Sequence, residues 1–153
     1  MRSQQNEHSS WERAVRVIKP DQFDSHTPQT AGMQRVSAVS RQLADTRGVW
    51  AGVTDVEAHV GTGKHHHGEQ ETIIYVVTGS IQMVWGEHLE FQADAQAGDF
   101  IYVPPFVPHK EMNAGDIPSQ WVIVRTGQEP IVVNLEPVES AQQALNENLH
   151  GIK

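Results

Sequence analysis

The sequence predicts an all-β fold, a single domain built as a sandwich or barrel of short strands. Short runs rich in β-branched and aromatic residues follow one another from Met33 to Leu135. Glycines and prolines separate these runs at regular intervals, as they do where strands are joined by tight turns. No helical period stands between the runs, so the pattern favours a sandwich or barrel over a parallel α/β fold.

The length of 153 residues fits one domain with flexible ends. Hydrophobic residues make up 38% and charged residues 20%, which is typical of a globular protein. We expect a disordered N-terminal segment over residues 1–12, the β-barrel over residues 13–135, and a short helix or tail over residues 136–153.

The elements follow in order along the chain. Arg13–Lys19 alternates apolar and basic residues and predicts a first strand, whereas residues 20–32 carry prolines and predict a loop. A surface helix with few apolar positions is expected at Ser140–Leu149. The remaining strands are expected at Gln34–Ser40, Val49–Val60, Thr72–Thr78, Ser80–Trp85, Leu89–Ala93, Asp99–Val103, His109–Asn113, Trp121–Arg125 and Ile131–Leu135.

The net charge of −8 disfavours binding to nucleic acids and to anionic membrane surfaces, so neither is an expected partner. The sequence has no apolar run long enough to span a membrane, and its polar N-terminus lacks a signal peptide's apolar core. We therefore expect a cytoplasmic protein. The absence of cysteine leaves histidine nitrogen and carboxylate or amide oxygen as the ligands of any metal site.

Two short clusters carry the residues for such a site. His65 and His67 stand two positions apart, and so do His109 and Glu111. Side chains two apart on a strand share a face, so each pair can point into the barrel. Together they predict a site with three nitrogens and one oxygen, which suits Fe, Mn, Ni, Co, Cu or Zn without choosing among them. Six-fold coordination would leave two positions for water, substrate or O₂.

Each cluster also has a simpler explanation. Three adjacent histidines can form an exposed polar run, and a His-x-Glu pair is common on a strand surface. Both explanations weaken because the two clusters occur together in a β-rich chain, each beside glycines or prolines.

The two clusters resemble the two sequence motifs of the cupin superfamily. Gly98, Pro104, His109 and Asn113 match the second motif at every spacing. His65, His67 and Gly79 match the first motif. The resemblance covers roughly residues 50–125 and implies a cupin double-stranded β-helix, also called a jelly-roll barrel, with one divalent metal and no organic cofactor.

Two departures from the motifs affect the predicted site. Phe106 stands where the second motif has glycine, and Thr72 stands where the first motif has its glutamate. Glu71 is one residue early, and a shift of one residue turns a strand side chain to the opposite face.

The first cluster is also similar to that of pirins, a cupin branch whose fourth ligand lies two residues after the last histidine. That position is Glu111 here, so Glu111 is the predicted fourth ligand and Glu71 the alternative.

The resemblance implies a metal-dependent protein that binds a small molecule. Dioxygenase chemistry on a small oxygen-rich substrate is the leading hypothesis, and isomerase or lyase chemistry comes next. Thr72 and Gln70 are expected to orient the substrate, with Glu71 as the candidate base. Thr72, Gln70 and Asn113 are also the expected hydrogen-bond partners of the histidine rings.

Two other hypotheses stay open, because the cupin fold serves many functions. One is a binding or sensing protein without turnover, and the other is a purely structural metal site. Cupins commonly pair, so we expect a homodimer in which Val15–Ile18 is a candidate for exchange between subunits.

Overall fold

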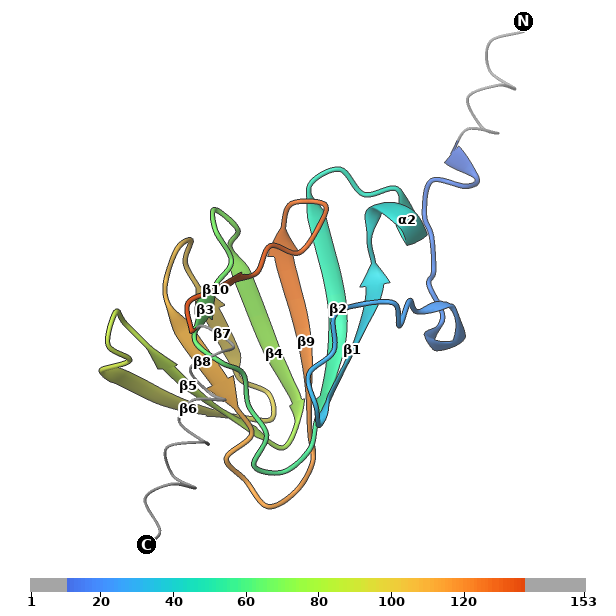
Figure 1. The fold of residues 1–153 in the computed structure, drawn as a ribbon. Coiled ribbons are helices and arrows are strands. Elements are labelled where there is room, and N and C mark those ends of the chain that lie inside the picture. Colours follow the sequence, from blue (N-terminus) through green and yellow to red (C-terminus); the bar gives the residue numbers. More distant parts are fainter. Residues whose placement is uncertain (1–10, 137–153) are drawn as a thin grey trace, which may run out of the picture.

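The computed structural model describes residues 11–136 and consists of two five-stranded antiparallel sheets (Figure 1). The strand order is β1-β2-β9-β4-β7 in the larger sheet and β10-β3-β8-β5-β6 in the other. The predicted all-β fold is confirmed. The strands are β1 (Met33–Val39), β2 (Val49–Val56), β3 (His65–His66), β4 (Thr72–Thr78), β5 (Ser80–Trp85), β6 (Phe91–Gln96), β7 (Phe100–Val103), β8 (His109–Met112), β9 (Ser119–Thr126) and β10 (Val133–Asn134).

Most predicted strands have counterparts with shifted ends. β4 and β5 agree with the prediction to the residue, because Gly79 with φ +74° makes the tight turn between them. β2 ends at Val56, four residues early, because the chain turns at His59, which has φ +63°. β6 begins at Phe91 because a turn with Leu89 at φ +54° comes first.

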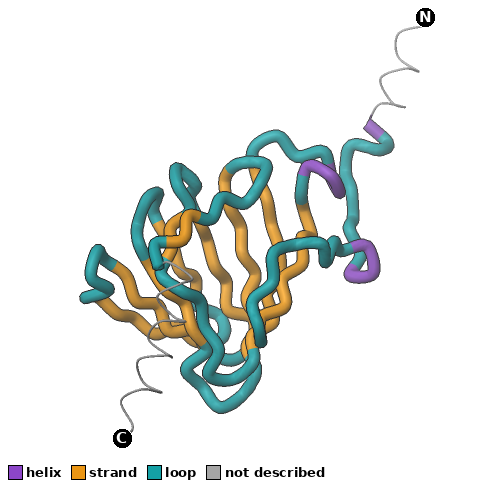
Figure 2. Tube along the Cα trace, in the orientation of Figure 1, coloured by secondary structure: helices purple, strands orange, loops and turns teal. Residues whose placement is uncertain are grey.

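The predicted strand at residues 13–19 does not form (Figure 2). This prediction was wrong because a strand needs a neighbour, and alternation alone does not supply one. A short turn begins at Trp11, and Arg16 donates a hydrogen bond to the carbonyl of Ala44. The predicted disordered segment over residues 1–12 lies outside the described residues except for Trp11 and Glu12, as does the predicted terminal helix.

Two short helical elements were not predicted. The first is the 3-10 turn η1 (Pro20–Gln22), which Pro20 opens with its fixed φ. The second is α2 (Arg41–Ala44), where the Ser40 hydroxyl caps the first turn by accepting a hydrogen bond from the Leu43 amide. No helix within residues 11–136 is long and apolar enough to cross a membrane.

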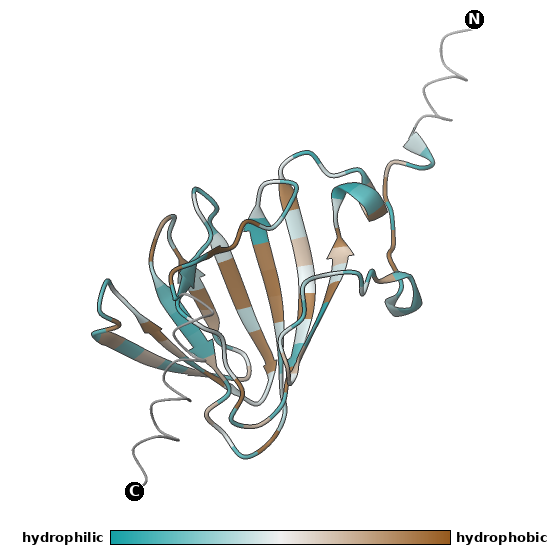
Figure 3. Cartoon of the chain, viewed as in Figure 1, coloured by the Kyte–Doolittle hydropathy of each residue, from teal (hydrophilic) through white to brown (hydrophobic). Residues whose placement is uncertain are grey.

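The hydrophobic core lies between the two sheets. Strand β9 shows the alternation clearly, because Ser119, Trp121, Ile123 and Arg125 are buried and the residues between them are more exposed. Figure 3 shows hydrophobic residues concentrated along β4 and β9 in the middle of the larger sheet. The core residues are Met33, Trp50, Val56, Ile74, Val76, Ile81, Met83, Ala95, Val103, Trp121 and Ile123.

Candidate metal centre

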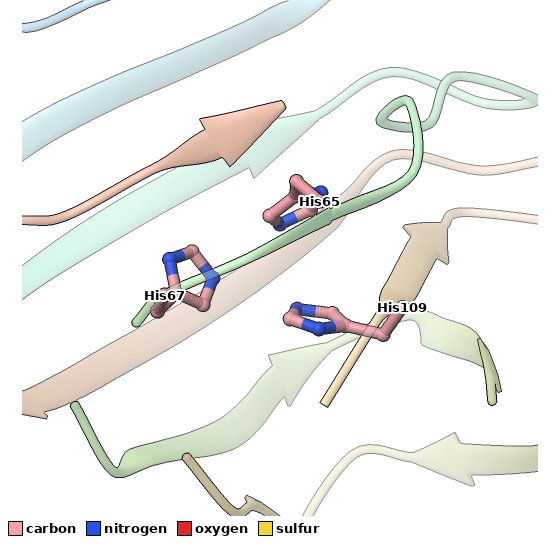
Figure 4. Close-up of side chains that lie close together, drawn as sticks. All are labelled: His65, His67 and His109. Carbon is pink, nitrogen blue, oxygen red and sulfur yellow. The ribbon is translucent and has the colours of Figure 1, made fainter. Parts of the chain in front are cut away.

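Three histidines converge inside the fold from two adjacent strands. His65 on β3 pairs directly with His109 on β8, and the centroids of their rings lie 4.4 Å apart. His67 follows β3, with its ring centroid 4.9 Å from His65 and 5.2 Å from His109. All three side chains are buried, and one ring nitrogen of each lies within 4.8 Å of the others (Figure 4). The geometry fits a single metal ion.

Each ring is held by a backbone carbonyl. The Nδ1 atoms of His65, His67 and His109 lie 2.7, 2.7 and 2.8 Å from the carbonyl oxygens of Gly63, Ile131 and Val107. A carbonyl oxygen can only accept, so each Nδ1 carries the proton and each Nε2 keeps a free lone pair. The prediction that Thr72, Gln70 and Asn113 hold the rings was wrong, because these carbonyls occupy the Nδ1 atoms.

Glu111 supplies the oxygen nearest to this cluster. Its carboxylate is buried, with Oε2 3.2 Å from His109 Nε2 and Oε1 3.7 Å from His65 Nε2. Neither Oε2 nor the facing Nε2 of His109 has a hydrogen-bond partner among the described residues. Buried polar atoms without partners are costly, so their convergence fits a cation between them.

The electrostatics of the site keep two of the histidines neutral. Burial lowers the pKa of His65 and lowers that of His67 to about 3, with the charge of Arg125 contributing to the second shift. Neutral imidazole is the form that binds a metal. For His67, two causes therefore favour the metal-binding form at neutral pH.

His109 and Glu111 form a coupled pair. Burial lowers the pKa of His109, but the adjacent Glu111 carboxylate raises it by more. The pKa of His109 therefore lies above its ordinary value. Burial raises the pKa of Glu111, but the contact of its carboxylate with His109 outweighs burial, so the pKa of Glu111 falls well below its usual range. Glu111 is therefore an anion at neutral pH.

The other predicted site residues lie at three different places. Thr72 is fully buried, and its hydroxyl has no partner among the described residues. Gln70 is buried, and its amide binds backbone atoms of Thr126, Glu129 and Ile131 at 2.7 to 2.8 Å. Glu71 is exposed and accepts a hydrogen bond from the Tyr102 hydroxyl. The structure therefore brings Glu111 to the histidines and leaves Glu71 on the outer face.

Sequence reasoning missed Arg125, which is 8% exposed and lies beside the cluster. Its Nη2 atom is 3.5 Å from His67 Nε2, and its Nε atom has no partner in the described part of the chain. The alternation of Trp121, Ile123 and Arg125 along one predicted strand was the signal that could have placed Arg125 inside.

The turn before His109 contains Phe106, which adopts φ +62°, a conformation that favours glycine. Its side chain is largely exposed, and its amide donates a 2.8 Å hydrogen bond to the carbonyl of Gly68. The Phe106 ring lies 6.0 Å from the ring of His66, the histidine that does not join the cluster. The backbone therefore keeps the shape that the motif's glycine would give it, despite the larger side chain.

Two surface pockets lie away from the histidines. One, of about 800 Å³, lies along β1 and includes Arg35. The other, of about 630 Å³, is lined by residues including Gln70 and Ile131, which belong to the region that holds His67. The second pocket therefore shares with the candidate metal centre only Ile131, whose carbonyl holds the His67 ring, and no histidine of the cluster lines it.

The comparisons with known proteins agree with this fold. Residues 52–125 match the family described as a cupin domain, and no curated protein sequence matches the chain significantly. A conserved protein from Klebsiella pneumoniae with a double-stranded β-helix domain is 19% identical, with a TM-score of 0.62, over 80% of this chain and 99% of its own.

Two further solved structures share the fold. A variant of oxalate decarboxylase from Bacillus subtilis is 20% identical, with a TM-score of 0.63, over 78% of this chain and 34% of its own. KdgF from Halomonas sp. is 16% identical, with a TM-score of 0.61, over 75% of this chain and 96% of its own. The chain thus spans about a third of the decarboxylase and nearly all of the other two proteins.

Proposed function

The chain belongs to the cupin superfamily, and from that premise we propose that it is a metal-dependent enzyme acting on a small oxygen-rich molecule. The proposed ligands of one divalent metal are His65, His67, His109 and Glu111. The observation that carries the proposal is the set of three carbonyl contacts that leave three Nε2 atoms free beside a buried carboxylate.

The donor set fits a divalent transition metal, with Fe, Mn, Ni, Co, Cu and Zn all compatible. When bound, such an ion would polarise substrate oxygens or support reaction with O₂. The three carbonyls fix the ring orientations, Glu111 supplies the compensating negative charge, and the surrounding core limits the access of water. The hydroxyl of Thr72 is buried without a partner among the described residues, so it is free to contact a substrate.

Oxygenase chemistry is the leading form of the proposal. Four protein ligands would leave two positions of a six-coordinate ion for substrate and O₂. Isomerase or lyase chemistry is the next form, supported by the shared fold of oxalate decarboxylase, for which Mn(II) centres are described. Because that likeness is low in sequence identity, it supports the choice of metal class more than the choice of reaction.

A second candidate function is a purely structural metal site. The near-complete burial of all four proposed ligands favours it, because structural sites are closed to external ligands. The two candidates differ in whether coordination positions are free for an external ligand. A binding or sensing protein without turnover would share the open position with the enzyme and differ from it in forming no product.

The test uses untagged protein, freed of metal with a chelator and reloaded with Fe(II) under anaerobic conditions. Elemental analysis is expected to give one iron per chain, and added nitric oxide is expected to produce the electron paramagnetic resonance signal of an iron–nitrosyl complex. Failure to bind any divalent metal would refute the proposed centre. Bound iron without a nitrosyl signal would refute the oxygenase form and favour a closed site.

A further inference from the structure

Arg125, Thr72 and Trp50 lie side by side across the larger sheet. Arg125 on β9 pairs with Trp50 on β2 and, on its other side, with Thr72 on β4. All three side chains are buried, which places them on the inner face of the sheet. The Trp50 indole is fixed in turn by a 3.1 Å hydrogen bond from its Nε1 to the hydroxyl of Ser37.

The Arg125 guanidinium has few partners for a buried cation. Its Cζ atom lies 5.4 Å from the centroid of the Trp50 ring, which holds one face of the guanidinium. Its Nη2 atom makes a long 3.5 Å contact with His67 Nε2, and its Nε atom has no partner within the described residues. Among residues 11–136, no carboxylate lies within 4.0 Å of it.

The charge of Arg125 persists despite this burial. A guanidinium holds its proton far above neutral pH, so burial alone does not remove the charge. The group therefore remains a cation at neutral pH. A buried cation without a paired anion is costly, and a structure that keeps one needs a compensating ligand.

Metal binding would increase this need. The lone pair of His67 Nε2 is the acceptor of the Nη2 contact, and a bound metal would occupy that lone pair. The guanidinium would then have no side-chain acceptor among the residues around it. A divalent metal with one carboxylate and one guanidinium also carries a net positive charge, which favours an anionic ligand.

We propose that Arg125 and Thr72 form a binding site for a carboxylate group, so that the small molecule recognised at the metal centre is a carboxylic acid. The inference rests on the proposed metal centre and names the class of its ligand. The planar guanidinium donates two parallel hydrogen bonds that match a carboxylate, and the Thr72 hydroxyl, unpartnered on the neighbouring strand, adds a third donor. Trp50 keeps the guanidinium in place.

The test measures ligand binding rather than turnover. Protein loaded with Co(II) is titrated with acetate, with its neutral analogue acetamide and with inorganic phosphate, and the Co(II) absorption spectrum reports each binding event. Wild type is expected to bind acetate at least about 10-fold more tightly than acetamide, because charge-assisted hydrogen bonds contribute more than neutral ones. Preference for phosphate over acetate, or equal binding of acetate and acetamide, would overturn the inference.

The variants separate Arg125 from the metal. Arg125→Met is expected to weaken acetate binding by about 10- to 100-fold, and Thr72→Val by about 5- to 10-fold, with Co(II) still bound at one per chain. Arg125→Lys keeps the charge and the volume, and is expected to lose part of the acetate affinity because it lacks the planar fork. It also serves as the test variant if Arg125→Met does not fold.

The matched control is Arg47→Met. Arg47 is exposed and lies in the loop between α2 and β2. This variant removes the same charge and is expected to leave acetate affinity unchanged. Equal losses of acetate affinity in the Arg47 and Arg125 variants would show that the effect depends on net charge alone and would overturn the inference. Failure of wild type to bind Co(II) would instead refute the proposed metal centre.

Discussion

The Nε2 atom of His109 and the Oε2 atom of Glu111 lie 3.2 Å apart in the interior and form an ion pair when His109 is protonated. Two atoms that bind one metal at about 2.1 Å and at right angles would be about 3 Å apart. The separation is therefore the one expected of two adjacent ligands.

This relationship predicts the effect of removing the carboxylate. Glu111→Gln is expected to weaken metal binding by more than about 100-fold, because an amide oxygen carries no charge and is a poorer ligand. Competition with a coloured chelator measures the affinity. Glu71→Gln is the matched control on the outer face and is expected to bind metal as wild type does. The opposite pattern would make Glu71 the fourth ligand.

Metal binding is expected to release one proton near neutral pH. The pKa of His109 lies above its ordinary value, so below that pKa the metal competes with a proton for Nε2. The pKa values of His65 and His67 are lowered, so these rings are already neutral there. Affinity should fall about tenfold per pH unit below the His109 pKa and level off above it. Calorimetry in two buffers counts the protons, and release of three protons would contradict this account.

The metal-free protein is expected to lose stability in mild acid. The folded pKa of His67 is about 3, against an ordinary value of 6.5, so between these values the unfolded chain binds more protons than the folded one. The contribution of His67 therefore lowers the free energy of unfolding as the pH is lowered, by up to about 1.4 kcal/mol per pH unit in that range. Urea unfolding at several pH values, with chelator present, gives the slope. His67→Gln should flatten the slope, whereas the exposed His88→Gln should leave it unchanged.

Phe106 predicts a measurable difference between two substitutions. Phe106→Gly and Phe106→Ala both remove the exposed ring, but only alanine keeps a Cβ atom in the left-handed conformation at φ +62°. Phe106→Gly is therefore expected to be more stable than Phe106→Ala by about 1 kcal/mol, after allowing for the greater entropy of unfolded glycine. Thermal unfolding compares them. A more stable alanine variant would show that the turn does not need this conformation.

The outer face of β4 and β7 predicts a homodimer. Ile73 pairs with Tyr102 there, and Tyr75 with Phe100, and the large apolar side chains Ile73, Phe100 and Tyr102 are exposed. Contiguous exposed apolar surface of this kind marks protein contacts. Light scattering is expected to report a dimer for wild type and a dissociation constant at least about 10-fold higher for Phe100→Ser. Ile117→Ser, at an exposed loop position, is the control, and a monomeric wild type would contradict the prediction.

The predictable part of the site is the part that strand parity governs. Alternation predicts that His65 shares a strand face with His67, and that His109 shares one with Glu111. It also located β4, where Thr72, Ile74 and Val76 alternate and are buried. These relations are local, so a single sequence contains them.

The remaining parts depend on contacts between distant segments. The carbonyl that orients His67 belongs to Ile131, 64 residues away, and no local sequence pattern predicts this contact. Alternation along β9 could have placed Arg125 on the inner face, but its neighbours Trp50 and Thr72 follow from the place of β9 between β2 and β4, which is a matter of strand order. The strand expected at residues 13–19 failed for the same reason, because pairing partners are not encoded in alternation.

The amide of Gln70 joins the candidate metal centre to a surface loop. It holds Thr126, Glu129 and Ile131 together, and Gly127 approaches it so closely that a Cβ atom would lie 2.6 Å from its Nε2. The exposed loop and the tilt of the His67 imidazole are therefore set by one side chain. Lengthening or shortening the loop at residues 127–130 is expected to change which metal the site prefers, although the ligands stay the same. Related proteins could therefore come to bind different metals through changes in a surface loop.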